Sequence, residues 1–266
     1  MRSDDDGLTF SKPVAITSTF NEFRSAYPWK VLAIGPNHGI QLTGGRLVVP
    51  VWLSTGEGEG GHRPSVTSTI YSDDAGATWH AGRIAVPNTP EFVNPNETVV
   101  VQLADGRVML NVRNESTKER RIVVTSPDGA TGWSEPKFDD ALLEPICMGA
   151  IARVSLASTG DKNRIVFANP NTLANANGKV DLSKRRNLSV KLTYDEGATW
   201  PVNKTPEAGS SGYSDLAMLP DGTILCFYGR GNDPTNSMYK SGSLTLARFN
   251  LEWLTEGRDS IEPRKP

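Results

Sequence analysis

The sequence predicts an all-β protein with the architecture of a β-propeller, and three observations lead to this fold class. Helix signals are scarce, short apolar strands recur after turn sequences, and a second sequence element recurs in step with the strands. Both repeated features share an uneven period of about 60 residues. A strand-only repeat of that length is typical of four-stranded propeller blades, which bury their faces against neighbouring blades. We expect residues 1–266 to form one domain of this kind.

The strands are predicted from apolar runs that each follow a turn. Alternating apolar and polar residues, rich in Val, Ile and Leu, are typical of β-strands. Glycine suits the turns because it adopts positive φ at low cost. The turn glycines recur at intervals of 61, 54 and 62 residues. The runs are GRLVVPVW (45–52), GRVMLNVR (106–113), NRIVFANP (163–170) and GTILCFYG (222–229), and the turn glycines are Gly45, Gly106, Gly160 and Gly222.

The second repeated element is an Asp box of the form Ser/Thr-x-Asp-x-Gly-x-Thr-Trp/Phe. In such a segment the Asp accepts backbone N–H bonds within a turn, the Gly permits the tight backbone, and the Trp packs between sheets. We therefore expect Asp74 and Asp195 to be structural, on hairpins at the rim of the blades. The copies are SDDDGLTF (3–10), SDDAGATW (72–79), TYDEGATW (193–200) and the degenerate SPDGATGW (126–133).

Glu97 and Tyr213 occupy equivalent positions in the repeats of two different blades. Each lies nine residues ahead of a turn glycine, at Gly106 and Gly222 respectively. Because the inner strands of a propeller run along one axis, we expect the two side chains to converge on one pocket. A glutamate within hydrogen-bond reach can take the proton of a tyrosine as its hydroxyl attacks an electrophile. Taken singly, a core tyrosine and a surface glutamate would be the simpler interpretation.

The Asp boxes and the positions of Glu97 and Tyr213 in the repeats together resemble the sialidases (exo-α-neuraminidases), over essentially the whole chain. The resemblance implies a six-bladed β-propeller that removes terminal α-linked sialic acids from glycoproteins, glycolipids and oligosaccharides, with retention of configuration. Tyr213 would be the nucleophile and Glu97 its base, since sialidases are an exception among retaining glycosidases in using a tyrosine. Sialic acid carries a carboxylate on its anomeric carbon, which would repel an anionic nucleophile. No metal or organic cofactor is implied.

The resemblance also assigns arginines to the substrate carboxylate, because a planar guanidinium makes bidentate, charge-assisted bonds to such a group. The segment LNVRN (110–114) supplies Arg113, and RRNLSVKL (185–192) supplies Arg185. Arg186 is adjacent and would point to the opposite face of a strand. The choice of Arg185 over Arg186 therefore rests on the motif.

Two further segments resemble the family. Trp52, at the end of GPNHGIQLTGGRLVVPVW (35–52), matches an aromatic residue beside the glycan pocket, although a core or rim tryptophan fits the pattern as well. LEPICMGAI (143–151) also resembles a family segment and is assigned no chemistry. Four other arginines are interpreted as solvated surface charges: Arg120, Arg121, Arg153 and Arg164.

Two parts of the family pattern have no match in this sequence. They are an Arg-Ile-Pro segment with the first arginine and the aspartate that serves as general acid/base. In the family both lie upstream of the first Asp box, and this sequence begins inside that box. We therefore expect a propeller that is incomplete at its N-terminus, with about four to four and a half blades. Two other functions stay open: a non-catalytic Asp-box propeller that binds glycans or proteins, and a glycosidase acting on another acidic sugar.

Composition argues against several other classes of protein. With 28 Lys and Arg against 30 Asp and Glu the net charge is −2, which disfavours nucleic acid or an anionic membrane as the main partner. No apolar run approaches the roughly 20 residues needed to span a bilayer. Two cysteines and three scattered histidines form neither a disulfide framework nor a metal-ligand cluster. The N-terminus lacks an apolar signal-peptide core, so we expect a secreted or periplasmic protein only if an upstream segment carries a signal peptide.

Overall fold

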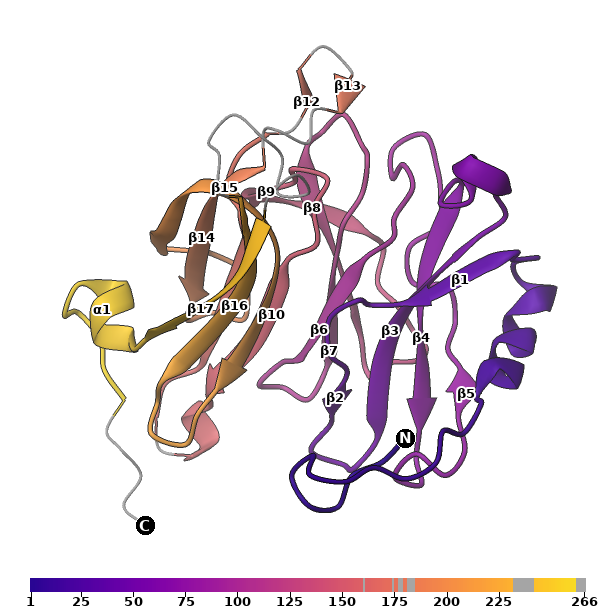
Figure 1. Ribbon diagram of the computed structural model, residues 1–266, viewed down its shortest axis with the longest axis horizontal. Helices are drawn as coiled ribbons and strands as arrows, with labels where there is room; N and C mark the ends of the chain where they lie inside the picture. The colour runs from indigo at the N-terminus through magenta and orange to yellow at the C-terminus, as the bar shows by residue number, and fades with distance from the viewer. Residues whose placement is uncertain (160, 174, 177–178, 181–184, 232–241, 262–266) are drawn as a thin grey trace.

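Antiparallel β-sheets that pack side by side make up the fold (Figure 1). The structure is a computed structural model that describes residues 1–159, 161–173, 175–176, 179–180, 185–231 and 242–261. Within these residues there is one five-stranded, one four-stranded, one six-stranded and one two-stranded sheet. The six-stranded sheet consists of two blades that share one long strand. The fold is therefore the predicted all-β propeller, with four blades among the described residues.

The first blade is the five-stranded sheet. Its elements are η1 (Thr17–Ser25), β1 (Val31–Ile34), β2 (Ile40–Gln41), β3 (Leu47–Ser54), η2 (Gly58–Gly60), β4 (Ser65–Ser72) and β5 (His80–Ala81). Strand β3 pairs with β4 along its whole length, and with β1 and β2 in succession on its other side. Phe20 and Phe23 of η1 are buried against Val51 and Leu53 of β3, so this short helix covers the outer face of the sheet.

The second blade is buried on both faces. Its strands, paired in chain order, are β6 (Thr98–Gln102), β7 (Val108–Val112), β8 (Arg120–Ser126) and β9 (Lys137–Leu143). Successive side chains of a strand point to opposite faces. Accordingly Val100 joins an apolar cluster with Val48 of the first blade, whereas Val99 joins one with Ile151 of the third blade. The second blade therefore packs against the first blade with one face and against the third blade with the other.

The third and fourth blades share strand β15, which is 17 residues long. The elements are β10 (Ala150–Ser155), η3 (Ala157–Thr159), β11 (Arg164–Pro170), β12 (Asn175–Ala176), β13 (Lys179–Val180), β14 (Arg186–Thr193), β15 (Val202–Met218), β16 (Ile224–Gly231), β17 (Gly242–Phe249) and α1 (Leu251–Thr255). The first half of β15 pairs with β14 up to Ser210, and the second half pairs with β16 from Ser211. The chain thus passes from the outer strand of one blade to the inner strand of the next without a turn.

The Asp boxes form hairpin loops held by their own side chains. Asp74 accepts hydrogen bonds from the backbone N–H (2.8 Å) and the hydroxyl (2.6 Å) of Thr78. Asp195 accepts the same two bonds from Thr199, at the same distances. The hydrogen bonds that the motif predicts are therefore made within each loop.

These loops lie at the turn end of the blades. Glu196 of the third-blade box accepts a hydrogen bond (2.8 Å) from the backbone N–H of Ala104, in the turn that follows β6. Glu97 precedes the same strand. The box and Glu97 therefore lie toward opposite ends of β6.

Glycines and a tryptophan of the repeats follow the predicted pattern. Gly106 (φ +90°) and Gly76 (φ +88°) adopt the left-handed backbone that their turns require, whereas Gly160 lies outside the described residues. Trp200 packs against an apolar cluster between sheets. Phe10, which takes the place of the tryptophan in the first box, is 61% exposed because no sheet of the described residues covers it.

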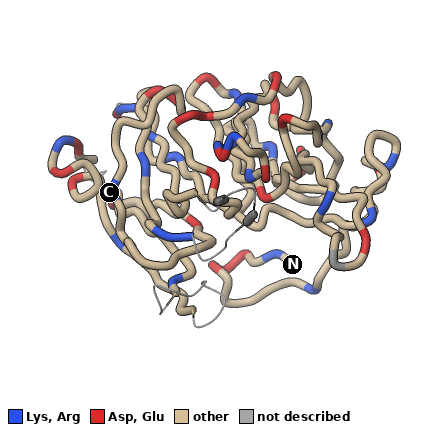
Figure 2. Tube along the Cα trace, turned by 90° about the horizontal axis from the view of Figure 1, so that it is seen from above, with Lys and Arg blue, Asp and Glu red and all other residues tan. Residues whose placement is uncertain are grey.

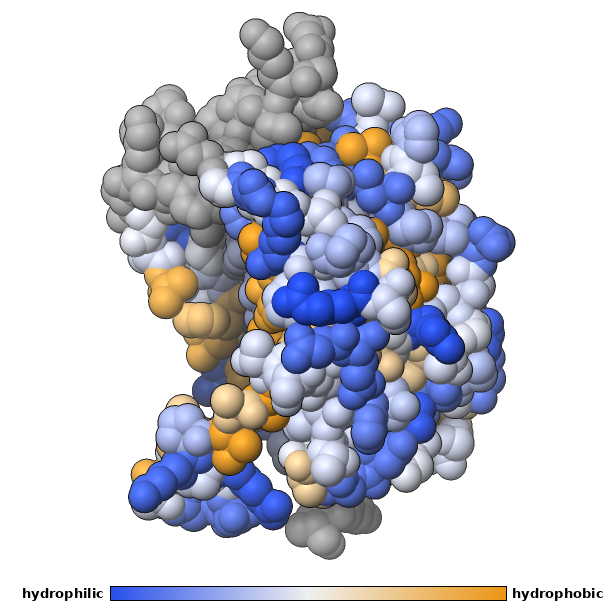
Figure 3. Space-filling model, turned by 90° about the vertical axis from the view of Figure 1, so that its right-hand side faces the viewer, coloured by the Kyte–Doolittle hydropathy of each residue, from blue (hydrophilic) through white to orange (hydrophobic). Residues whose placement is uncertain are grey.

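Charge and polarity are spread over the surface. Acidic and basic residues are interspersed along the chain (Figure 2), and the face that carries η1 and the first blade is mostly hydrophilic (Figure 3). Among the described residues, no helix has both the length and the apolar character that a membrane-spanning helix needs.

Candidate active site

Tyr213 and Glu97 are in direct contact. Tyr213 lies on β15, and Glu97 directly precedes β6, so the two residues come from the inner strands of different blades. The hydroxyl of Tyr213 donates a hydrogen bond to Oε1 of Glu97. The backbone N–H of Glu97 donates to the side-chain oxygen of Asn96 (2.7 Å), which holds the end of the strand in place. The two residues, which occupy equivalent positions in the sequence repeat, thus lie next to each other in space.

Arg113 touches both members of this pair. It directly follows β7 and faces Glu97 across the ladder, with hydrogen bonds from Arg113 N to Glu97 O (3.0 Å) and from Asn96 N to Arg113 O (3.0 Å). Its Nη1 donates to Oε2 of Glu97 and to the hydroxyl oxygen of Tyr213, the latter at 3.1 Å. Only 13% of the Arg113 side chain and 14% of the Glu97 side chain are exposed. The cation, the carboxylate and the phenol therefore form one largely desolvated cluster.

The surroundings of Tyr213 and Arg113 shift their pKa values. Burial raises the pKa of Tyr213 above its ordinary value, and the negative charge of Glu97 raises it further, although Arg113 acts in the opposite direction. Burial opposes the charged form of Arg113, but the neighbouring charges of Glu97 and Tyr213 prevail and raise its pKa. At neutral pH the cluster therefore contains a neutral phenol and a charged arginine.

Arg185 lies on the other side of Tyr213. Its side chain is buried, its guanidinium carbon lies 5.8 Å from the centre of the Tyr213 ring, and Nη2 donates to the backbone carbonyl of Ile146. Its neighbour Arg186 is half-buried and begins strand β14. Of the two adjacent arginines, Arg185 is thus the one placed beside the tyrosine.

A cavity of about 190 Å³ opens onto this cluster. Trp52 forms part of its wall from β3, and its ring centre lies 5.6 Å from that of His62. Arg185 does not line this cavity directly. The residues that line it are Trp52, His62, Arg63, Asn96, Glu97, Arg113, Glu115 and Tyr213.

Four residues of this lining were not predicted as site residues: His62, Arg63, Asn96 and Glu115. Arg63 forms a two-point ion pair with Glu115, in which Nε and Nη2 each lie 2.7 Å from a carboxylate oxygen. Glu115 follows Arg113 by two residues, a spacing that places both side chains on one face of an extended chain and could have identified it. No sequence signal marks Arg63, because its loop has no counterpart in the repeat.

A buried ion pair supports the loop that binds Arg185. The interpretation of Arg121 as a surface charge is wrong, since its side chain is fully buried and its Nη1 lies 2.8 Å from Glu144 Oε2. Nη1 also donates to the carbonyl of Cys147 (3.0 Å), whose N–H donates to Glu144 Oε1 (3.1 Å). These bonds shape the turn that contains Ile146, the acceptor for Arg185. The segment 143–151, to which no chemistry was assigned, is therefore part of the support of the site.

The surface interpretation fails for two more arginines. Arg164 is 1% exposed because Nε and Nη2 each lie 2.7 Å from a carboxylate oxygen of Asp259, which anchors the end of the described chain to β11. Arg153 is 17% exposed and pairs with Glu196. Burial of these charges is possible because each has a carboxylate partner.

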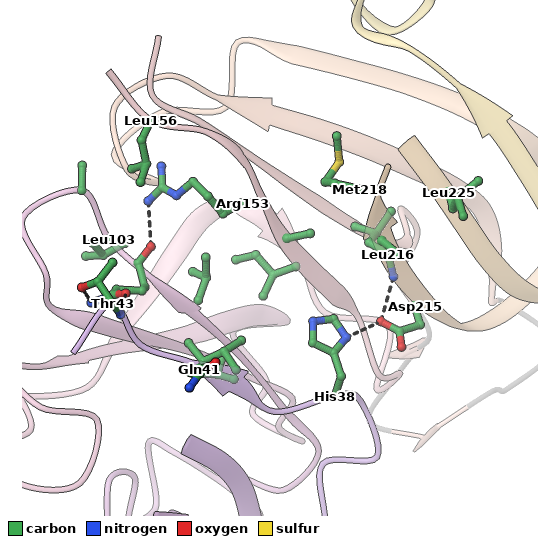
Figure 4. Close-up of a pocket in the computed structure, with 18 of the residues that line it drawn as sticks. His38, Gln41, Thr43, Leu103, Arg153, Leu156, Asp215, Leu216, Met218 and Leu225 are labelled. Atoms are coloured by element: carbon green, nitrogen blue, oxygen red, sulfur yellow. Dashed lines mark hydrogen bonds and ion pairs between the residues drawn. The ribbon is translucent and has the colours of Figure 1, made fainter. Parts of the chain in front are cut away.

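A second cavity of about 800 Å³ lies along the inner strands (Figure 4). His38 points toward Asp215, with Nδ1 2.8 Å from Oδ1, and this hydrogen bond raises the pKa of the histidine. The other labelled side chains are mainly aliphatic, and Arg153 is neutralised by Glu196. Neither Tyr213 nor Glu97 lines this larger cavity.

Comparison with known proteins places the chain in a family. The model of the BNR repeat-like domain matches residues 1–226. A sialidase of Micromonospora viridifaciens is 30% identical over 259 residues, which cover 95% of this chain and 35% of the relative. The chain belongs to the sialidase family. Within this family, a sialidase of Bacteroides fragilis is 29% identical over 85% of the chain and 38% of the relative.

A solved sialidase structure has a similar fold. The Hadza microbial sialidase Hz136 superposes on this sialidase-family chain with a TM-score of 0.70 and 28% identity, over 95% of this chain and 43% of that one. The chain thus spans little more than a third of the length of the two curated relatives, at 35% and 38%.

Proposed function

We propose that this chain carries an exo-α-sialidase site, which hydrolyses terminal α-linked sialic acids with retention of configuration. The observation that carries the proposal is the hydrogen bond from Tyr213 to Glu97, with Arg113 in contact with both side chains. The substrates would be sialylated glycoproteins, glycolipids and oligosaccharides. Relatives named sialidase support this substrate class.

In the first step, the hydroxyl oxygen of Tyr213 attacks the anomeric carbon. The new O–C bond forms as the glycosidic C–O bond breaks, and the electron pair of that bond leaves on the aglycone oxygen. Glu97 accepts the phenol proton during the attack, because it already accepts the hydrogen bond from that hydroxyl. Since the pKa of Tyr213 is raised, the nucleophile approaches as a neutral group and does not repel the carboxylate of the substrate.

Arginines on two sides of Tyr213 suit the anionic substrate. Arg113 lies 3.1 Å from the hydroxyl oxygen, where it can stabilise negative charge that develops on the phenol. Arg185, stacked beside the ring, would bind the carboxylate on the anomeric carbon together with Arg113. Trp52 would form the wall of the glycan pocket.

In the second step, water attacks the anomeric carbon of the tyrosyl intermediate. The bond to Tyr213 breaks, its electron pair returns to the phenol oxygen, and Glu97 gives the proton back. The proton that the attacking water loses passes to solvent and balances the one taken up by the aglycone oxygen. Two displacements at one carbon retain the configuration. An aryl leaving group departs without protonation more readily than a sugar, so an aryl sialoside is the direct substrate for a first test.

The test measures release of 4-methylumbelliferone from its α-sialoside by the full chain and its variants. Tyr213→Phe removes the nucleophile and should abolish turnover, and Glu97→Gln should reduce kcat by about 10²–10⁴-fold. Tyr71→Phe is the matched control, since the Tyr71 ring packs under Arg46, away from this cavity. Turnover that survives Tyr213→Phe would refute the assigned nucleophile. Sialic acid binding without turnover by the unaltered chain would favour a glycan-binding propeller instead.

A further inference from the structure

We propose that Arg63 and Glu115 form a hydrogen-bonding pair for the sugar that leaves, the residue to which sialic acid is attached. This inference rests on the proposed function, because it assigns the outer part of the same substrate. Both residues line the cavity that contains Tyr213, Glu97 and Arg113. They come from different blades, Arg63 from the loop between β3 and β4 and Glu115 from the segment after β7.

The pair is rigidly built. Nε and Nη2 of Arg63 each lie 2.7 Å from a different oxygen of Glu115. Glu115 also accepts a hydrogen bond from the side-chain amide of Asn94 (3.0 Å), and its backbone N–H donates to Val93 (2.8 Å). Two-point pairing of this kind fixes the plane of the guanidinium as well as its position.

Arg63 lies nearer to solvent than the reacting groups. Glu115 is two residues beyond Arg113, and hydrogen bonds to the chain before β6 continue from Arg113 to Glu115. Arg63 has 49% of its side chain exposed and Glu115 has 12%, against 13% for Arg113. The anomeric carbon and its carboxylate must lie at Tyr213 and Arg113. The half-exposed Arg63 therefore faces a part of the substrate nearer to solvent.

The chemistry of the pair suits a neutral polyol. A guanidinium carries five N–H donors, and Glu115 occupies those on Nε and one side of Nη2. Within the described part of the chain, no other side chain binds the guanidinium, so its remaining donors are available to a ligand. Because the charges of Arg63 and Glu115 cancel, the pair is better matched to sugar hydroxyls than to a second carboxylate.

The test compares two substrates that share sialic acid and differ in the leaving group. Sialyllactose leaves a sugar with hydroxyls, whereas 4-methylumbelliferyl sialoside leaves an aromatic alcohol. Arg63→Gln and Glu115→Gln should lower kcat/KM for sialyllactose about ten- to hundredfold, mainly through KM, and should leave the aryl substrate nearly unchanged. Within one variant, the ratio of kcat/KM for sialyllactose to kcat/KM for the aryl sialoside does not depend on how much of the protein is folded.

The matched control is Arg107→Gln. Arg107 also pairs with a carboxylate, that of Asp105 at 2.8 Å, and is about half-exposed, but it does not line this cavity. Its substitution should leave the ratio unchanged. If Arg63→Gln lowers kcat/KM equally for both substrates, or for neither, the pair does not bind the leaving sugar. This inference then fails, and the proposed function is unaffected. If the unaltered chain turns over neither substrate, the proposed function fails and this inference with it.

Discussion

The hydroxyl of Tyr213 donates a hydrogen bond to the carboxylate of Glu97, although 116 residues separate them along the chain. Arg113 completes the contact with its Nη1 3.1 Å from the same hydroxyl oxygen. One positive charge, one negative charge and one neutral phenol can be desolvated together because their charges cancel. The proton of the phenol is the one that must move when the oxygen attacks. The arrangement therefore holds the proposed nucleophile and base in contact before substrate arrives.

The position of Arg185 leads to a prediction about binding. Arg185→Gln should weaken binding of free N-acetylneuraminic acid by about one to two orders of magnitude, because one charge-assisted hydrogen bond contributes roughly 1.5–3 kcal/mol. Isothermal titration calorimetry measures the change. Arg186→Gln is the adjacent control and should bind as the unaltered chain does. The reverse result would show that the wrong arginine of the pair has been assigned.

The buried pair of Arg121 and Glu144 should matter for stability. Its side chains are 0% and 1% exposed, so Glu144→Ala leaves an uncompensated buried charge and should cost about 3–5 kcal/mol in the free energy of unfolding. Asp105→Ala breaks a pair of similar length on the surface and should cost less than about 1 kcal/mol. Urea unfolding measures both values. Similar losses in the two variants would contradict the structural role assigned to Glu144.

The Asp boxes should affect stability without affecting catalysis. Asp195→Ala removes the acceptor for two hydrogen bonds of Thr199 and should lower the free energy of unfolding by roughly 1–3 kcal/mol. Turnover per folded molecule should be unchanged, because this box and Glu97 lie toward opposite ends of β6. Asp140→Ala, at an exposed position of β9, serves as the control for stability. A fully folded Asp195→Ala protein with little activity would place the box in the site.

The degenerate box predicts a dependence of stability on pH. Burial opposes ionisation of Asp128, but hydrogen bonds from the backbone N–H groups of Ala130 (2.9 Å) and Thr131 (2.7 Å) prevail and lower its pKa to about 2. Because the folded-state pKa lies below the ordinary 3.8, this contribution is complete above about pH 4 and is lost as the pH falls to about 2. Comparing Tm of the unaltered chain and of Asp128→Asn from pH 6 to pH 2 measures it. A difference that stays constant across this range would disprove the linkage.

Several features of this protein follow from local sequence chemistry. A turn glycine, an Asp box and an alternating apolar run each consist of a few consecutive residues. Their common period indicates blades without any knowledge of long-range contacts. The contact of Glu97 with Tyr213 could be anticipated for the same reason. Residues at equivalent positions in the repeats of two blades lie at equivalent positions on the inner strands, and those strands converge.

The sequence alone thus determined the all-β class, the repeated blade and the pairing of a glutamate with a tyrosine, because each of these depends on local or periodic patterns. Only the tertiary structure decided which charges are buried and which loops meet. Arg121 pairs with Glu144, 23 residues away in the sequence, and Arg164 pairs with Asp259, 95 residues away. Neither separation matches the period of the repeat. Arg63 meets Glu115 across 52 residues through a loop that belongs to one blade only. An arginine looks the same in a sequence whether water or a carboxylate will surround it, and the difference arises only when the blades pack.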